Sequence, residues 1–226
     1  ATIRKKASAV SSFYSYLVQE KVLTHNPADN TKRPQGESAP RFGLTEDEFL
    51  RLLNAALDHS STAHALVSLQ TGAGLRVSEA CSALIEDLDN DRSQLTTTVK
   101  RGHRRIKPLS PPVLAAVLTK IGDRTTGRIL TNRDGQPLSR QRGWELIKKL
   151  AGQAGITRDV TDHELRNTCA ELMLERGARI EDVSAVLGHK NLETTLRYVR
   201  SRDELAGMTS AINLLTPLLT APPDEQ

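Results

Sequence analysis

The sequence has little of what marks a secreted, metal-binding or membrane-spanning protein. Its 226 residues include only two cysteines, Cys81 and Cys169, which form no CxxC motif and have no zinc-ligand spacing. Both stand in apolar helical surroundings and are predicted to be reduced core residues. No apolar run approaches the roughly 20 residues that span a bilayer, and no signal peptide opens the chain. We therefore expect no membrane partner and a cytoplasmic location.

The excess of positive charge is small, but the basic residues are clustered. The 31 Lys and Arg residues against 27 Asp and Glu residues give a formal net charge of +4, which favours a polyanionic partner only mildly. The clusters are Lys100, Arg101, Arg104, Arg105 and Lys107 in one stretch, and Arg133, Arg140, Arg142, Lys148 and Lys149 in another. Such clusters suit contact with a phosphate backbone, although a solvated surface has the same composition.

Apolar spacing predicts an α+β fold that is mainly helical and contains one small antiparallel sheet or hairpin. Helices are expected before Asn26-Pro27, from the capping residue Thr45 to Leu57, over Ala63–Gln70, opening at Leu75–Glu79, over Pro111–Ile121, and from the capping residue Ser139 to Leu150. Two strand-like segments, residues 95–99 and 104–109, flank a turn and predict the hairpin.

The first 43 residues divide into a single helix and a linker. Residues 1–30 are predicted to form an amphipathic helix with Val10, Phe13, Tyr14, Leu17 and Val18 facing inward. One helix cannot bury such a face, so it must pack on a segment absent from this chain, on the main domain or on another protomer. Residues 31–43 are rich in Pro, Gly, Ser and charge, which predicts a domain linker. Because the chain starts at Ala1 instead of methionine, we interpret it as a fragment.

The stretch from Asp162 to Arg200 carries the polar residues that are hardest to explain as packing. His163 and Arg166 lie three residues apart, so they share one face of a predicted helix and can point at one ligand. An arginine offers a planar fork of donors for two phosphate oxygens, and a histidine moves a proton near neutral pH. Taken alone, such a pair is more often solvated than part of a site.

Two more polar residues follow in the same stretch. Gly188 is predicted to end the next helix, which puts His189 directly after a helix stop. Asn191 is predicted to cap a third helix that carries Tyr198. Singly, His189 is explained by the helix dipole and Tyr198 by ordinary packing. In this order and spacing, however, the arginine, the histidines and the tyrosine would hold a phosphodiester and offer a phenolic oxygen to attack it.

These segments resemble a known family. HELR at 163–166 and LGHKNLETTLRYV at 187–199 resemble the C-terminal signature of the tyrosine recombinase (lambda integrase-like) family, in which the tyrosine follows the LGH histidine by nine residues. GAGLRVSEA at 72–80 resembles the first arginine box of that family. The hairpin resembles the one whose lysine lies eight residues before a Pro-Leu dipeptide. Lys100 occupies that place, with five basic residues competing for it.

The resemblance implies a catalytic set, whose members are Arg76, Lys100, His163, Arg166, His189 and Tyr198. By resemblance, Arg76 and Arg166 clamp the non-bridging oxygens of the scissile phosphate. Attack by Tyr198 gives a 3′-phosphotyrosyl link and a free 5′-hydroxyl.

The remaining members of the set move or share protons. By resemblance, His163 acts as general acid/base near the tyrosine, Lys100 protonates the leaving 5′ oxygen, and His189 hydrogen-bonds the phosphate. No ATP is needed because the bond energy is kept in the link to protein. No cofactor or metal is expected, since the nearby Glu164, Glu171 and Glu193 lack a pattern for a Mg²⁺ pair.

Contacts with DNA are predicted from the hairpin and from one helix start. The candidate DNA-binding residues are Arg101, Arg104, Arg105, Arg140, Gln141 and Arg142. The last three lie in the first turn of a helix, the part that usually meets base edges, although a plain basic surface helix is an equal alternative. The resemblance implies double-stranded DNA with inverted-repeat core sites as substrate, a homo-tetramer on DNA and a bacterial nucleoid location, and it leaves room for an accessory DNA-bending protein.

The predicted organisation follows the same family. Residues 1–30 correspond to the last helix of a core-binding domain that is otherwise mostly absent, residues 31–43 to the linker and residues 44–206 to the catalytic domain. Residues 207–226 form a tail that docks on a neighbouring protomer or covers its own core. Many relatives have a histidine where this chain has Asn167, which cannot exchange a proton. Type IB topoisomerase-like relaxation of DNA, or a DNA-binding regulator that has lost recombination, are the alternative functions.

Overall fold

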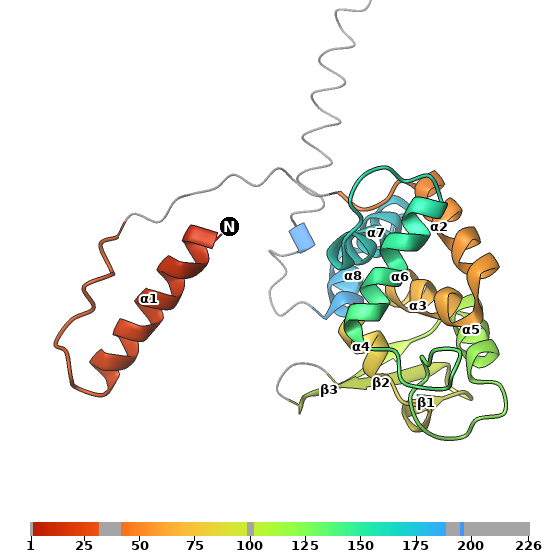
Figure 1. Cartoon of the computed structure of the whole chain (residues 1–226), viewed down its shortest axis with the longest axis horizontal. Coiled ribbons are helices and arrows are strands. Elements are labelled where there is room, and N and C mark those ends of the chain that lie inside the picture. Colours follow the sequence, from red (N-terminus) through yellow and green to blue (C-terminus); the bar gives the residue numbers. More distant parts are fainter. Residues whose placement is uncertain (1, 32–41, 99–101, 189–194, 197–226) are drawn as a thin grey trace, which may run out of the picture. The chain divides into compact units, whose positions relative to one another are not determined.

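A computed structural model of the chain describes residues 2–31, 42–98, 102–188 and 195–196. The chain forms two compact units, Ala1–Arg41 and Phe42–Gln226 (Figure 1). Its described elements are α1 (Thr2–Gln19), α2 (Glu46–His59), α3 (Ser61–Gly72), α4 (Val77–Ser82), the 3-10 helix η1 (Ile85–Asp87), β1 (Leu88–Asp89), β2 (Gln94–Thr98), β3 (Arg104–Pro108), α5 (Pro111–Ile121), α6 (Arg140–Gln153), α7 (Asp162–Glu175) and α8 (Ile180–Leu187). None of these helices is long and apolar enough to cross a membrane.

The helix of the first unit, α1, ends earlier than its apolar pattern predicts. It stops at Gln19, and Lys21 takes a left-handed backbone with a φ of 59°. The Lys21 amide donates to the Val18 carbonyl at 3.0 Å, and the Val22 amide donates to the Leu17 carbonyl at 2.9 Å. This is a Schellman ending, which is usually built on glycine. A lysine at that position gives no local signal that the helix stops.

The apolar face of α1 is open within the first unit. Val10 is 50% exposed and Phe13 is 58% exposed, although both were predicted to face inward. The segment after α1 is tied back to it by Asn26, whose side-chain amide donates to the Ser11 carbonyl at 3.1 Å and to the Ser15 hydroxyl at 2.9 Å. The described part of this unit therefore leaves the apolar face of its helix without a covering layer.

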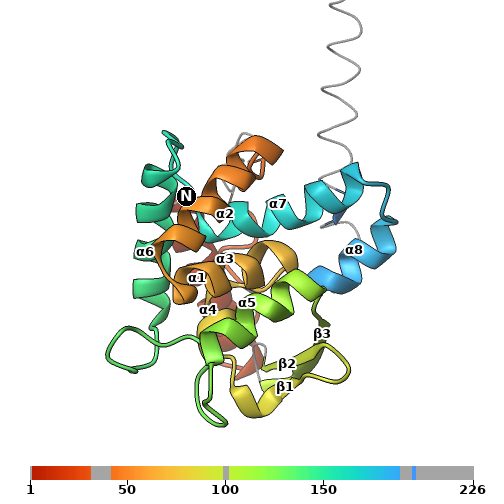
Figure 2. The same cartoon turned by 90° about the vertical axis from the view of Figure 1, so that its right-hand side faces the viewer.

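The central helix of the second unit is α3. Its residues 65–71 are all buried, and Leu66 and Leu69 have no exposed surface. It packs against α2, α4, α5, α6 and α7, and both views show it in the middle of the unit (Figures 1 and 2). A helix that is covered on most sides does not need a distinct polar face, and the polar residues Ser68, Gln70 and Thr71 of α3 are buried with its apolar ones. The turn that follows α3 therefore starts from a fixed point in the core.

The strands form one three-stranded antiparallel sheet in the order β1-β2-β3, which confirms the predicted small sheet and adds the short strand β1. Leu95 pairs with Lys107, and Thr96 pairs with Ile106. Side chains alternate between the two faces of a strand. Lys107 consequently shares the inner face with the fully buried Leu95, whereas Ile106 faces solvent and is 63% exposed. The lysine is inside and the isoleucine is outside, which reverses the usual pattern.

Side-chain caps fix several helix starts. Thr45 and Glu48 form the capping box predicted for α2, with hydrogen bonds of 3.2 and 3.0 Å. Ser139 caps α6, also as predicted. A further capping box, made by Thr161 and Glu164, opens α7. The first turn of α7, which holds His163, thus has a defined start.

Arg158 connects two of these caps. Its Nη1 donates to Glu164 at 2.7 Å, and its Nη2 donates to Glu48 at 3.2 Å and to the Gly43 carbonyl at 2.8 Å. Burial by itself raises the pKa of Glu48, but hydrogen bonding and charge from Arg158, with the Thr45 amide, bring that pKa below its usual value. The starts of α2 and α7 are therefore held together by one guanidinium.

Gly43 lies directly on the backbone of α7. Its amide donates to Glu171 at 2.9 Å, and the next amide, of Leu44, donates to the Thr168 hydroxyl at 2.7 Å. A Cβ added at Gly43 would lie 2.4 Å from the Thr168 nitrogen. Because the neighbour is backbone, it cannot move aside cheaply, and no side chain fits between the two segments.

Replacing Gly43 with alanine is expected to lower the free energy of unfolding by about 2–3 kcal/mol, because the new methyl group separates the chain from α7. Gly152 in α6 is the matched control, since nothing lies within 4 Å of a Cβ added there. Gly152→Ala should raise stability by about 0.5–1 kcal/mol through helix propensity. Urea denaturation measures both changes, and equal effects of the two substitutions would refute the close contact.

Candidate active site

The turn between α3 and α4 presents Arg76. Its backbone amide donates to Glu79 Oε2 at 3.0 Å, and its Nη1 donates to Glu79 Oε1 at 2.7 Å. The Glu79 side chain is 8% exposed, whereas that of Arg76 is 39% exposed. A buried carboxylate therefore holds the guanidinium from behind and leaves part of it open. An anion can approach the open side.

Arg166 joins this turn to the end of α8. The residue is buried, with 4% of its surface exposed. Its Nη1 donates to the Gly74 carbonyl, two residues before Arg76, and its Nη2 donates to the Leu187 carbonyl. Hydrogen bonds from a charged donor are stronger than neutral ones. The structure thus brings Arg76 and Arg166 into one region, and the Arg166 guanidinium donates to backbone carbonyls there.

Gly74 makes this approach possible. Its φ of 63° lies in the left-handed region, and a Cβ added there would lie 3.0 Å from Leu187 Cδ2 and 3.5 Å from Cys169 Sγ. A side chain would both strain the turn and push it away from α7 and α8. The second glycine of GAGLRVSEA is therefore required by packing as well as by backbone conformation.

Three cationic side chains donate to backbone carbonyls at the carboxyl end of α8, two from β3 and one from α7. The carbonyls of Val186, Leu187 and Gly188, here called the α8 carbonyl cluster, accept from Lys107, Arg166 and Arg105 respectively. The last carbonyls of a helix lack partners within it and carry the negative end of its dipole. Figures 1 and 2 show α8 between α7 and β3, the elements that supply these cations. The cluster therefore ties together the sheet, α7 and α8.

Gly188 ends α8 in the left-handed conformation, as predicted, with a φ of 65°. A Cβ added there would lie 1.4 Å from Nη1 of Arg105. Any side chain at this position would therefore displace Arg105 from the carbonyl. His189 follows Gly188 directly in the sequence.

Lys107 lies in this region but was not among the predicted catalytic or DNA-binding residues. Only 2% of its surface is exposed. Burial lowers its pKa from 10.5 to about 8, with Arg166 and Arg105 adding to the decrease and Glu79 opposing it. It had been counted among the basic residues of the hairpin. The strand register gives the missing signal, because the residue opposite the inward-facing Leu95 must also face inward.

The other predicted residues of α7 have different surroundings. His163 is exposed in the first turn, one turn before the buried Arg166, and Asn167 is partly buried. Cys169 is a free, buried thiol, as is Cys81. Burial raises the pKa of Cys169 to about 11, while the positive charges of Arg166 and Lys107 lower it.

Within the described residues, no group of His, Cys, Asp or Glu side chains is placed to hold a metal ion.

Several predicted residues lie outside the part of the chain that the structure describes. These are the catalytic candidates Lys100, His189 and Tyr198, the DNA-binding candidate Arg101, and the segment 207–226. Of the predicted third helix, residues 195–196 are described and are helical. The roles given to these residues stay predictions.

The described DNA-binding candidates fall into two groups. In the hairpin, Arg104 is paired with Asp87, and Arg105 is half-buried and bound to the α8 carbonyl cluster. At the start of α6, the adjacent residues Arg140, Gln141 and Arg142 are all exposed. The first turn of α6 thus presents two exposed cations, and the Gln141 amide beside them donates to Glu145 at 3.0 Å. Arg105, by contrast, is bound to a backbone carbonyl within the protein.

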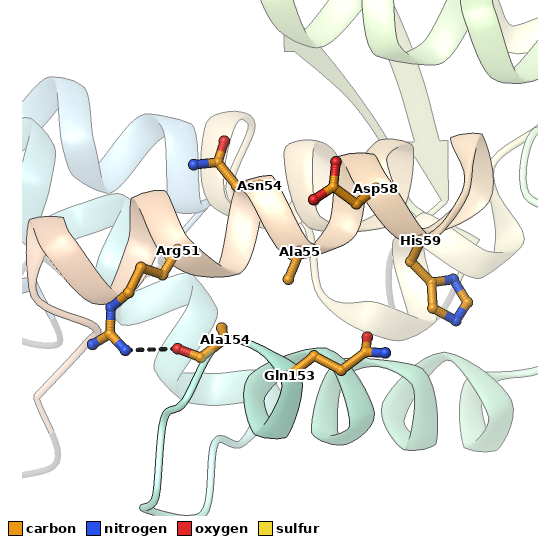
Figure 3. A pocket seen from close by; sticks show the side chains of 7 residues that line it. All are labelled: Arg51, Asn54, Ala55, Asp58, His59, Gln153 and Ala154. Atoms are coloured by element: carbon orange, nitrogen blue, oxygen red, sulfur yellow. Dashed lines mark hydrogen bonds between the residues drawn. The ribbon is translucent and has the colours of Figure 1, made fainter.

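A separate groove lies between α2 and α6 (Figure 3). Its cavity of about 460 Å³ is lined by Arg51, Asn54, Ala55, Asp58, His59, Gln153 and Ala154. Arg51 closes one end by donating to the Ala154 carbonyl at 2.6 Å. Burial, followed by the charges of Lys149 and Arg133, lowers the pKa of His59. None of the residues predicted for catalysis or DNA binding lines this groove.

The sequence matches a family model and named relatives. The model of the phage integrase family matches residues 43–204. The tyrosine recombinase XerD of Oceanobacillus iheyensis is 29% identical over 209 residues, which cover 88% of this chain and 70% of the relative. The family match, over residues 43–204, includes the segments that contain Arg76, Arg166 and the α8 carbonyl cluster.

Solved structures are similar in fold. The crystal structure of XerA recombinase gives a TM-score of 0.63 at 26% identity, covering 84% of this chain and 69% of that one. A lambda integrase dimer bound to a COC′ core site gives a TM-score of 0.68 at 21% identity, covering 85% and 57% of the two chains. The mainly helical domain with a small antiparallel sheet is shared with both.

The pKa of Lys107 predicts how stability changes with pH. Because its pKa is about 8 in the folded chain and 10.5 is its usual value, the unfolded chain binds more protons between these values, and stability rises with pH in that window. Lys107→Met should lack this rise, which amounts to about 3 kcal/mol. Cys169 acts oppositely in both proteins, since its raised pKa lowers stability as the pH rises above 9.

Chemical denaturation from about pH 7 to about pH 10.5 measures this difference. The free energy of unfolding of wild type relative to Lys107→Met is the quantity of interest, because contributions common to both proteins cancel. A difference that stays constant over this range would contradict the burial of a charged lysine.

Proposed function

Because the chain belongs to the phage integrase family and is a tyrosine-type site-specific recombinase, we propose that it cleaves and rejoins DNA strands through a covalent link between Tyr198 and a 3′ phosphate. One observation carries this proposal. Arg166 binds both the turn before Arg76 and the last residue of α8. The segments that resemble the arginine box, HELR and LGH are thereby joined by one side chain.

The chemistry requires positive charge and proton transfer. A tyrosine hydroxyl with an unperturbed pKa near 10 is a poor nucleophile at neutral pH, so a base must take its proton. In the proposed step, the Tyr198 oxygen bonds to phosphorus, and the bond to the 5′ oxygen breaks. His163 accepts the proton of the tyrosine hydroxyl, and Lys100 donates a proton to the leaving 5′ oxygen.

The two arginines stabilise the transition state. In this proposal, Arg76 and Arg166 donate to the non-bridging oxygens, where removing one fixed donor costs about 100- to 1000-fold in rate. Arg76 is the member already open on one side, and His189 adds a hydrogen bond to the same phosphate. One phosphodiester replaces another, so the reverse step rejoins the strand without ATP.

The proposed substrate is double-stranded DNA that contains inverted core sites, bound by several copies of the protein. The lambda integrase relative was crystallised as a dimer on a core site, which supports both DNA and self-association here. The exposed start of α6 is the proposed contact with base edges, with Arg104 on the sugar–phosphate backbone. A tetramer, an accessory DNA-bending protein and a nucleoid location belong to the same proposal. The named relatives do not favour topoisomerase-like relaxation or a regulator without catalysis.

Tyr198→Phe is expected to abolish the covalent protein–DNA adduct, because phenylalanine lacks the attacking oxygen. The assay is incubation with nicked suicide DNA followed by denaturing electrophoresis. Tyr16→Phe, at a position that is 54% exposed in α1, is the control and should form the adduct as wild type does. An adduct that persists at the wild-type level in Tyr198→Phe would end the assignment of the nucleophile.

Arg140→Ala is expected to weaken DNA binding and to reduce the slope of log K against log salt by about 1 if the side chain meets a phosphate. If it meets a base edge, discrimination between sites should fall by about 1–3 kcal/mol. Arg176→Ala is the charge-matched control, because Arg176 pairs with Glu46 at 2.9 Å and is proposed for no DNA contact. Titration of labelled DNA at several salt concentrations measures both variants. Identical slopes and affinities for the two would remove α6 from the DNA interface.

A further inference from the structure

Lys107 occupies an inward-facing position of the hairpin, where an apolar side chain is usual. It faces the core opposite the fully buried Leu95, while the neighbouring Ile106 faces solvent. Exchanging these two residue types would give the ordinary pattern of an outward polar and an inward apolar residue. Burying an ammonium is costly unless its partners compensate. The position therefore carries a cation that stability alone does not require.

The groups that face Lys107 come from each element around it. Arg166 and Cys169 belong to α7, Glu79 to α4 and Arg105 to the same strand, and each acts on the charge of the lysine. Its Nζ donates to the Val186 carbonyl of α8. Among these groups Glu79 is the one carboxylate, and it also holds Arg76. The surplus of positive charge is thus met mainly by the negative end of α8.

In this arrangement Lys107 helps to hold the end of α8 in place. Val186, Leu187 and Gly188 are successive residues, and each carbonyl is bound by a different cation. Three hydrogen bonds on three successive residues fix the position of the carboxyl end of α8. Lys107 provides the first of them, and it also lies beside the guanidinium that provides the second.

We propose that Lys107 is a positioning residue for strand cleavage, whose charged side chain holds the α8 carbonyl cluster in place for Arg166. The inference rests on the proposed function, since it assigns Lys107 to the same reaction. It differs from the role proposed for Lys100, because Lys107 acts through the backbone of α8 and does not touch the substrate. Loss of the proton at Lys107 weakens its hold on the carbonyl and slows cleavage.

The test compares wild type, Lys107→Met and Lys107→Arg in single-turnover adduct formation on nicked suicide DNA. Methionine is similar to lysine in volume but one atom shorter and has no charge, and arginine keeps the charge at every pH used. The rate at saturating protein and the half-saturating protein concentration are both measured from about pH 7 to about pH 10. Thermal unfolding shows whether each variant folds cooperatively.

At about pH 7, Lys107→Met is expected to react about 10- to 100-fold more slowly, as for a small misplacement of catalytic groups, with little change in the half-saturating concentration. The ratio of wild-type to Lys107→Met rates should fall as the pH rises, because wild type loses its charge. Lys107→Arg should retain more activity than Lys107→Met, and its rate relative to wild type should rise with pH. If Lys107→Met does not fold, the change with pH in the rate of Lys107→Arg relative to wild type tests the inference.

Equal rates of wild type and Lys107→Met at all pH values would overturn the inference, as would a ratio that does not change with pH. A cavity-filling role would give the pH-independent ratio. Failure of the proposed function looks different, because wild type itself would then form no adduct at any pH.

Discussion

The buried guanidinium of Arg166 is the interaction on which the rest of the site depends. It donates to carbonyls that belong to Gly74 and Leu187, and it extends from α7, so one planar group joins three segments. Removing one partner of a buried charged interaction costs about 3–5 kcal/mol, because the remaining group is left without compensation. The turn that presents Arg76 and the end of α8 are therefore not independent loops. Each has its position because Arg166 occupies the space between them.

The side chains around this guanidinium are mainly positively charged. Lys107 and Arg105 add positive charge beside Arg166, and Glu79 is committed to Arg76. The helix dipole and the backbone carbonyls that face these cations are only partial charges. A phosphate diester would supply the full negative charge. Sites that bind or turn over a ligand commonly retain residues that weaken the fold in this way.

Local features of the fold were predictable because their signals lie within one helical turn. Thr45 with Glu48, Ser139 before α6 and Gly188 after α8 all act on backbone groups three or four residues away, and each was placed correctly. The end of α1 was not, because Lys21 adopts a conformation that sequence assigns to glycine. The fold class followed from apolar periodicity, and the family from the order of the motifs.

The candidate site was only partly predictable for a different reason. Arg76 and Arg166 were identified by motif and spacing. The pairing of Arg76 with Glu79 is local, since the two residues lie three apart, but nothing near Arg166 in the sequence indicates that Gly74 accepts a hydrogen bond from it. Lys107 was grouped with the basic hairpin residues that were expected to contact a phosphate backbone. Its burial follows from pairing with Leu95, which requires the register of the sheet.

The sequence by itself indicated which residues are candidates for the chemistry, the capped starts of α2 and α6, and the family to which the chain belongs. Tertiary structure alone decided which of these side chains meet. Arg166 and Gly74 are separated by 92 residues, Arg105 and Gly188 by 83, and Lys107 and Val186 by 79. Contacts over such distances depend on how α3, α7, α8 and the sheet pack around a common core, and packing depends on the shape and volume of all of them together. Composition and periodicity report the local free-energy preferences of the chain, whereas the meeting of these cations at one helix end is a property of the assembled fold.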